Sequence, residues 1–195
     1  DGAGVYGGFA GTETSRSQRD FRTNETILSG DLNGDDGPNW ANNSDNAYHV
    51  LTATATSVST TLDGVTVVGG NNTGAPGPET AGAGLWVKYG GAALANCTFW
   101  KNRAVGSGGA IAFSASAARV FNCRFLSNTC DGAGGAVRVN GGTGEFANCL
   151  FVNNTSTQYY GGGLFLDQTT FQDVVNCTFY GNTASQNGGG ISMAS

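Results

Sequence analysis

The sequence predicts an all-β fold, a right-handed parallel β-helix, from two phrases that recur in phase and from strand-like alternation. The first phrase begins Asn-Cys-x-Phe, and its four cysteines are 26, 26 and 28 residues apart. The second is a glycine run that ends in an aliphatic residue. Copies of the first are at 96–102, 122–128, 148–154 and 176–182, and copies of the second are at 108–111, 134–137, 161–164 and 188–191. A nearly constant period in this range is typical of a solenoid, in which each repeat forms one coil.

The composition agrees with this fold and excludes several others. The chain has 195 residues, 33 of them glycine, and only 12% are charged. Glycine is not at every third position, which excludes collagen, and no segment has a helical period. The net charge of −5 disfavours nucleic acid or an anionic membrane as partner, because both require a basic surface. No apolar run approaches 18 residues, so no membrane-spanning segment is expected. The beginning at Asp1 indicates a processed or excised piece.

The regular coils contain two alternating strands. In the first full copy, Leu94, Cys97 and Phe99 are separated by small or polar residues, and the later copies repeat this pattern. After each glycine run a second strand alternates, as at 111–113. Period-two alternation places the first and third residues of such a triplet on one face. Short strands at this spacing predict stacked coils of parallel strands.

The chain before these copies fits the repeat less well. Residues 62–70 align with 94–102, which puts Val65 at the position of Cys97. The offset is 32 residues, which is longer than the repeat, so a loop must intervene. The polar segment 71–80 is the predicted position of that loop, because it is rich in turn-forming residues.

The first residues are predicted to form irregular coils. Strand-like segments there are separated by long polar stretches, and they are 5–9, 26–30 and 49–51. We therefore predict irregular N-terminal coils over 1–61 and regular β-helix coils over 62–195, within one continuous domain. Dividing the chain length by a repeat of about 26 residues gives about seven coils.

Stacked coils predict columns of like residues, because neighbouring parallel strands lie roughly 4.8 Å apart. Phenylalanines would form an interior aromatic column. Asparagines would form a ladder at a turn, where asparagine tolerates a left-handed backbone and stacked amides can bond from coil to coil. The predicted aromatic column is Phe99, Phe125, Phe151 and Phe179, and the predicted ladder is Asn102, Asn128, Asn154 and Asn182. Both roles are structural.

Four of the five cysteines occupy one repeat position. They are Cys97, Cys123, Cys149 and Cys177. Val65 stands at this position in the preceding segment, which indicates a small, buried, apolar site that a free thiol fills well. Cys130 falls where other repeats carry alanine or serine, and it is predicted to point inward too. Because the clustered CxxC spacing of a zinc site is missing, we predict buried thiols without a disulfide or metal role.

The two phrases resemble the repeats of the chlamydial polymorphic outer membrane proteins and of related bacterial β-helix proteins. The signature of that family pairs a Gly-Gly-Ala/Gly-Ile run with a Phe-x-x-Asn element. It is matched here by 109–111 and 99–102 and by their later copies. Segments 5–14 and 27–35 also resemble the beginning of this module in large secreted bacterial proteins. The resemblance implies surface display and adhesion as a passenger segment, without indicating one particular ligand.

A β-helix can also carry polysaccharide lyase or hydrolase chemistry. Such sites need two converging carboxylates, or a calcium cluster with a base beside it. The acidic residues of the repeat region stand at unrelated repeat positions, and no two are expected in one column of adjacent coils. Among them are Glu79, Asp131, Glu145, Asp167 and Asp173. We therefore predict that the protein is not an enzyme, and a carbohydrate-active enzyme fragment is the first alternative.

One segment before the repeats is a candidate calcium site. Asp31, Asn33 and Asp35 place oxygen side chains at every second residue around a glycine. This spacing resembles the first half of a calcium loop, where such side chains surround a hard cation. The distal glutamate of that loop is missing, because position 42 is asparagine. A structural calcium ion and a plain polar turn are both open interpretations.

A column of larger side chains directly follows the core positions. We call it the stripe, and its members are Val68, Trp100, Leu126, Val152 and Tyr180. If strand alternation continues, the stripe faces outward, where an apolar column marks a partner contact or lies under a loop. If the chain turns a corner at this point, the same residues face inward. The sequence leaves both interpretations open.

Together these observations predict a secreted or cell-surface bacterial protein with a structural or adhesive role. Its expected partners are copies of itself, joined end to end or side by side, and surface proteins or glycans. Uncapped coil ends expose unpaired backbone groups, so self-assembly into filaments is expected. A calcium-stabilised glycan-binding module is the second alternative.

Overall fold

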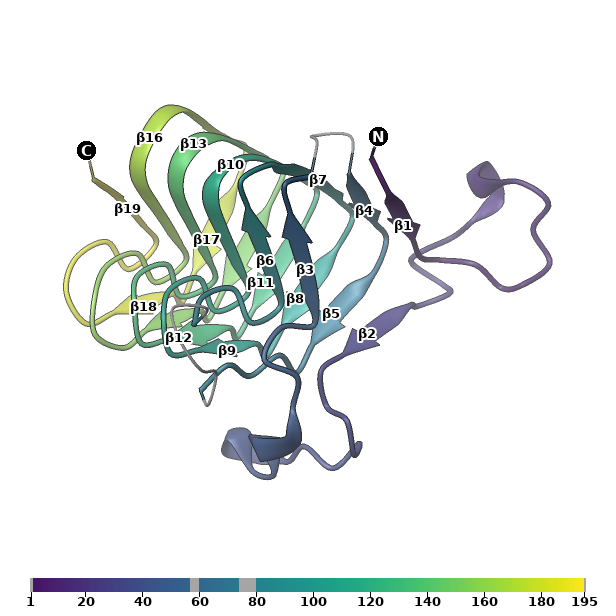
Figure 1. The fold of residues 1–195 in the computed structure, drawn as a ribbon, viewed down its shortest axis with the longest axis horizontal. Helices are drawn as coiled ribbons and strands as arrows, with labels where there is room; N and C mark the ends of the chain where they lie inside the picture. The colour runs from purple at the N-terminus through teal and green to yellow at the C-terminus, as the bar shows by residue number, and fades with distance from the viewer. Residues whose placement is uncertain (1, 57–59, 74–79, 195) are drawn as a thin grey trace.

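The computed structural model describes residues 2–56, 60–73 and 80–194, and these residues form a parallel β-solenoid (Figure 1). Three sheets run along it. Sheet A has the order β1-β4-β7-β10-β13-β16-β19 with β3 and β6 beside it, sheet B is β17-β14-β11-β8-β5-β2, and sheet C is β18-β15-β12-β9. All strand pairs among the described residues are parallel. The predicted all-β parallel fold is confirmed.

Sheet A contains the longest strands, β10, β13 and β16. Its strands are β1 (Gly4–Tyr6), β3 (Leu51–Thr54), β4 (Thr61–Asp63), β6 (Leu85–Lys88), β7 (Gly91–Ala95), β10 (Ile111–Phe121), β13 (Val137–Ala147), β16 (Leu164–Val175) and β19 (Ile191–Ala194). Sheet B contains β2 (Ile27–Ser29), β5 (Thr66–Val68), β8 (Thr98–Trp100), β11 (Arg124–Leu126), β14 (Leu150–Val152) and β17 (Thr178–Tyr180). Sheet C contains β9 (Arg103–Ala104), β12 (Thr129–Cys130), β15 (Thr155–Ser156) and β18 (Thr183–Ala184).

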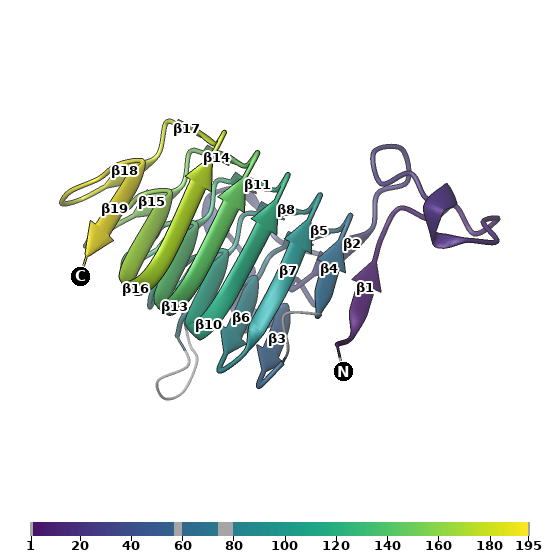
Figure 2. The same cartoon turned by 90° about the horizontal axis from the view of Figure 1, so that it is seen from above.

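The solenoid has about four complete turns of about 27 residues, so the predicted count of seven was wrong. Sheet C, whose strands mark the complete turns, has four strands among the described residues. The prediction divided the whole chain by the repeat, but two early segments leave the sheets as loops. These loops carry the short 3-10 helices η1 (Arg16–Gln18), η2 (Pro38–Trp40) and η3 (Asn43–Asp45). Strands β1 to β5 add rungs to sheets A and B as irregular N-terminal coils (Figure 2), and beside sheet C the chain that follows β5 adds an isolated bridge between Asn71 and Arg103. Part of the predicted loop at 71–80 lies outside the described residues.

Each turn of sheet A bends once. β10 pairs with β6 through its first half and with β7 through its second half. The bend residues are Tyr89, Ala115, Gly141 and Gln168, all with positive φ between 47° and 69°. A left-handed backbone costs a non-glycine residue roughly 1–2 kcal/mol. The paired strand segments on both sides hold that conformation in place.

The core consists of columns of like side chains. Along the phenylalanine column, consecutive ring centroids are 5.4, 4.6 and 4.5 Å apart, with interplanar angles of 13°, 15° and 7°. Phe99, Phe125 and Phe151 are fully buried, and Phe179 in the last complete turn is half-buried. Aliphatic columns from sheet A pack against them, and they include Leu94, Val120, Ile111, Val137 and Leu164. Full burial of one such side chain contributes about 1.5–3 kcal/mol.

Asparagine side chains connect consecutive turns inside the solenoid. The Nδ2 group of Asn102 donates to Oδ1 of Asn128 at 3.0 Å, and Asn128 donates in the same way to Asn154 at 3.0 Å. Asn154 then donates to Asn182 at 2.8 Å. The same oxygens accept backbone N–H groups of the preceding turn, and each Nδ2 also reaches a carbonyl there, such as that of Phe99. Every buried amide in this run is therefore hydrogen-bonded as both donor and acceptor.

Candidate functional site

The candidate functional site is a groove of about 520 Å³ at the ends of the sheet B strands. Ser29, Val68 and Trp100, which line it, are register partners on β2, β5 and β8. Ser127 and Asn153 extend the lining over the next two rungs. Neighbouring rungs lie roughly 4.8 Å apart, so five rungs give the groove a length of roughly 19 Å along the solenoid. We call it the sheet B groove.

The stripe lies on the outside of the solenoid along this groove. In β8, Phe99 points into the core and Trp100 points out, with 42% of its surface exposed. Tyr180 is 71% exposed, and Val68, Leu126 and Val152 are partly buried. Strand alternation therefore continues through the stripe positions. Two of its members, Val68 and Trp100, line the groove directly.

The loop between β2 and β3 (Figure 1) supplies Asp31, Asp36 and Trp40 to one side of the groove lining. Asp31 accepts hydrogen bonds from the backbone N–H groups of Gly34 at 2.7 Å and of Asp36 at 3.1 Å, which closes the loop on itself. The buried Asn46 ties the loop to sheet B. Its Nδ2 group donates to Oδ2 of Asp36 at 2.8 Å and to the carbonyl of Gly69 at 2.7 Å.

Trp40, at the end of η2, gives this side of the groove an aromatic surface. Its φ is 64°, and that of Asn39 before it is 55°. A left-handed backbone is rare for a bulky residue and marks stored strain, which concentrates at binding sites. The guanidinium carbon of Arg103 lies 6.0 Å from the Trp40 ring centroid, and Nζ of Lys101 lies 4.7 Å from that of Trp100. Each tryptophan ring is thus held by a cation–π contact, and such a contact contributes about 0.5–1 kcal/mol.

Three carboxylates of the same loop come together beside the groove. Ligand oxygens of Asp31, Asp35 and Asp45 all lie within 4.8 Å of one another. Of the predicted calcium ligands, Asn33 instead donates its backbone N–H to Oδ2 of Asp45 at 3.0 Å. Sequence spacing missed Asp45 because it lies beyond η2 in the chain. Only the folding of the loop brings its carboxylate next to those of Asp31 and Asp35.

Backbone hydrogen bonds in this loop stabilise the charged form of Asp31. Burial acts to raise the pKa, but hydrogen bonds from the N–H groups of Asp36, Gly34 and Asp35 outweigh it and lower the pKa below its usual value. Asp31 is therefore ionised at neutral pH. Hydrogen bonds of this kind favour the charged form of a carboxylate.

A second groove, of about 690 Å³, lies at the opposite ends of the sheet B strands. Its lining includes Arg22 and Arg124, and it reaches Cys97 and Cys123. An arginine from the first loop, Arg19, forms an ion pair with Asp63 close to this groove. We call it the cysteine groove.

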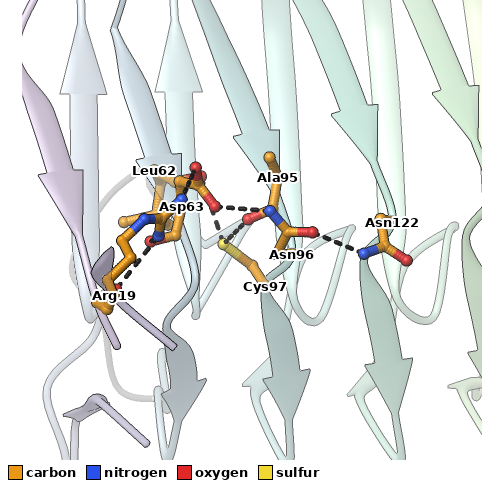
Figure 3. Close-up of polar contacts among 8 residues, drawn as sticks. Arg19, Leu62, Asp63, Ala95, Asn96, Cys97 and Asn122 are labelled. Carbon is orange, nitrogen blue, oxygen red and sulfur yellow. Dashed lines mark hydrogen bonds and ion pairs between the residues drawn. The ribbon is translucent and has the colours of Figure 1, made fainter. Parts of the chain in front are cut away.

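Figure 3 shows the polar chain beside it. Nδ2 of Asn96 donates to Oδ1 of Asp63 at 2.8 Å, and Nδ2 of Asn122 donates to Oδ1 of Asn96 at 2.6 Å. Arg19 reaches the other carboxylate oxygen of Asp63. The chain crosses three rungs and fixes the first loop to the coils.

The carboxylates of the coils correct one sequence expectation. Glu145 and Asp173 are register partners on β13 and β16, so two acidic residues do share a column on adjacent turns. Both lie four residues before a cysteine, and counting back from each cysteine would have found the pair. Arg119 continues the same column on β10. These side chains are partly or fully exposed on sheet A, and neither carboxylate lines the grooves described above.

The other acidic residues of the coils have structural partners. Oδ2 of Asp167 accepts a hydrogen bond from Nη2 of Arg138 at 2.7 Å, and Oδ1 of Asp131 accepts one from the Thr157 hydroxyl at 2.9 Å. Both contacts join neighbouring turns. Glu79 lies outside the described residues.

Comparison with protein families places the fold. The model of the right-handed β-helix region matches residues 41–195. The chain belongs to this family. The right-handed β-helix repeat that the sequence predicted is thereby confirmed. No match to the chain was found among curated proteins or solved structures. Among the described residues, no helix has the length and apolar character needed to cross a membrane.

Proposed function

We propose that this β-helix is an adhesive module of the bacterial surface that binds a glycan chain along the sheet B groove. The observation that carries the proposal is the pair of outward tryptophans, Trp40 and Trp100, within one elongated groove. A binding groove combines apolar or aromatic surface with a few placed polar groups. Tryptophan offers a flat ring to the C–H face of a sugar and suits a ligand that is apolar on one side and wet on the other.

The polar lining of the groove supports a sugar ligand over a purely apolar one. Ser127, Thr129, Asn153 and Thr155 provide hydroxyl and amide groups along the far rungs. These groups can donate and accept, as sugar hydroxyls require. They repeat from turn to turn at the rung spacing, so a ligand built from repeated units fits the groove better than a compact one.

The charge of the groove indicates which glycans fit. Asp31 and Asp36 line its wall, and Lys101 lines it beside Trp100, so two carboxylates outnumber one ammonium group in the lining. Like charges disfavour binding of uronic acids and sulfated sugars, because they repel in a partly desolvated site. Neutral or amino-sugar polymers are therefore the proposed class.

Surface display is part of the proposal. It is supported by the two phased motifs, which resemble those of the chlamydial polymorphic outer membrane proteins. Self-assembly through the stripe is the competing use of the same face. Light scattering over a concentration series distinguishes glycan binding from self-assembly. A molar mass that stays that of a monomer at every concentration, together with glycan binding, supports the adhesive module. Assembly that buries Trp100 contradicts it.

Calorimetric titration with soluble neutral polysaccharides tests glycan binding. Trp40→Ala and Trp100→Ala are each expected to weaken binding about tenfold, which corresponds to about 1.4 kcal/mol. Trp86→Ala is the matched control, because Trp86 stacks on His49 in sheet A and does not line the groove. Equal binding by all three variants would contradict the groove as the site.

The calcium ion expected from the sequence stays a prediction, and the groove wall offers its test. A cation held by Asp31, Asp35 and Asp45 would rigidify the loop that carries Trp40. Calcium should then protect residues 31–46 from proteolysis in the native chain and fail to do so in Asp45→Asn. Equal protection without calcium would favour the polar turn.

A further inference from the structure

Four cysteine side chains form a column inside the solenoid. Phenylalanines on β8, β11, β14 and β17 are register partners, and each cysteine of the column lies two residues before one of them. Each Sγ donates to the carbonyl two residues earlier, at 3.1–3.3 Å. The thiols therefore keep one orientation from turn to turn. Their sulfurs follow the rung spacing of roughly 4.8 Å.

Along the column the four thiols form two neighbouring pairs. Cys97 and Cys123 stand on adjacent rungs, and hydrogen bonding from the Cys123 thiol lowers the pKa of Cys97. In the other pair, the backbone N–H of Cys149 donates to Sγ of Cys177 at 3.4 Å. Burial raises the pKa of Cys149 to about 12. All four cysteines are free, so neither pair forms a disulfide.

We propose that the column binds two soft monovalent metal ions of the Cu(I) class, one between Cys97 and Cys123 and one between Cys149 and Cys177. Zinc–thiolate bonds are roughly 2.3 Å long, and a linear site with two metal–sulfur bonds of similar length spans roughly 4.6 Å. This span matches the rung spacing without a change of backbone. Thiolate ligands select Cu(I) over hard cations. Stacking of the turns supplies the pairs that CxxC spacing supplies in other metal sites.

The charge balance favours the first pair. Each ion displaces two thiol protons, which pass to water, and the two thiolates with one monovalent ion carry one net negative charge. The cysteine groove over Cys97 and Cys123 is lined by Arg22, Arg124 and Glu25, and the excess of one positive charge in this lining offsets that charge. The groove also gives an ion a path to these sulfurs. In the second pair, Cys177 is only half-buried and is reached from its own side.

The site is separate from the proposed glycan groove. The cysteine groove lies where the sheet B strands begin, and the glycan groove lies where they end. The two proposals therefore stand or fall independently.

Anaerobic titration of the full chain with Cu(I), against a competing chelator, tests the proposal. The wild-type chain should retain two ions and release four protons. Cys123→Val should retain one ion, and Cys123→Val with Cys149→Val should retain none. Valine is tolerated in this column, because Val65 stands at the Cys97 position one rung earlier and is buried.

Cys130→Ala provides the matched control. Cys130 is a buried thiol in sheet C, and its register partner on β9 is Ala104. This variant should retain two ions. The proposal would be overturned if the double valine variant kept both ions or if the wild-type chain failed to compete with the chelator. Disulfides found in the isolated protein by mass spectrometry would also overturn it.

Discussion

The N-terminal loops and the regular coils use different side chains to accept hydrogen bonds from their backbone N–H groups. In the loops, one carboxylate gathers several local backbone N–H groups. Glu13 accepts from Ala10, Gly11 and Thr12 at 2.7–3.0 Å, and Asp31 plays the same part in the next loop. In the coils, a buried asparagine amide accepts from one turn and donates to another.

The carboxylate and the amide differ in whether they can donate a hydrogen bond as well as accept one. An ionised carboxylate only accepts, so it completes one turn of chain and ends the hydrogen-bond network there. An amide both donates and accepts, so identical asparagines can bond to one another without limit. Local loops therefore need no repeat, whereas the coils depend on one. The predictions below test whether stability divides in the same way.

The largest expected effect is in the aromatic column. Phe125→Ala should lower the free energy of unfolding by about 3–5 kcal/mol, because it opens a cavity between two stacked rings. Leu28→Ala, at the half-buried N-terminal rung, should cost clearly less. Urea denaturation measures both. Equal losses would mean that the irregular rungs are packed as firmly as the coils.

The asparagine ladder should rank second. Asn128→Ala removes the acceptor of the Asn102 N–H and the side-chain donor to the carbonyl of Phe99, while Oδ1 of Asn154 keeps the backbone N–H of residue 128. Each unsatisfied buried group costs about 1–3 kcal/mol, so a total near 3 kcal/mol is expected.

The matched control for the ladder is Asn122→Gly. Asn122 is exposed at a turn with a φ of 52°, a conformation that glycine adopts freely. Its effect on the urea midpoint should stay within about 0.5 kcal/mol. A loss as large as that of Asn128→Ala would show that the outer asparagines matter as much as the buried ones.

The attachment of the first loop should rank third. Arg19→Met removes the ion pair with Asp63 and leaves that partly buried carboxylate without its cation. A loss of about 1–2 kcal/mol is expected, after a discount for partial exposure. Hydrogen exchange should quicken in β1 and around η1 while β10 to β16 keep their protection. Uniform quickening along the chain would contradict a local role.

Acidification should have the smallest effect in this series. It should loosen the N-terminal loops and leave the coils folded. Hydrogen bonds from Ala10 and from Glu13 itself lower the pKa of Glu13, and those from Thr23 and Arg22 lower that of Asp20. A lowered folded-state pKa stabilises the fold above the unfolded pKa, and this stability is lost as pH falls through the folded value. Proteolysis at pH 6 and at pH 3 should therefore reveal cleavage confined to residues 9–50. Simultaneous cleavage of the coils would argue against it.

The columns could be predicted from the sequence because parallel stacking in register turns a constant chain offset into a spatial contact. Phe99 and Phe125 are neighbours for that reason alone. The two early loops have no repeat, so nothing in the spacing placed Trp40 beside Trp100 or Asp45 beside Asp31. Those contacts depend on Asn46, which fastens the loop to the sheet through side-chain bonds. The turn count failed for the same reason, since loop residues were counted as coil.

The direction of the interstrand bonds has a mechanical consequence. β1 and β19 lie at opposite ends of sheet A, and the bonds between rungs point along the line that joins them. A pull along this line loads the rungs of the last turn before those of any inner turn, so turns peel away singly. Each peeled turn of 26 residues frees up to ~90 Å of chain. A molecule held at one end and loaded at the other would lengthen in nearly equal steps and absorb work at each one.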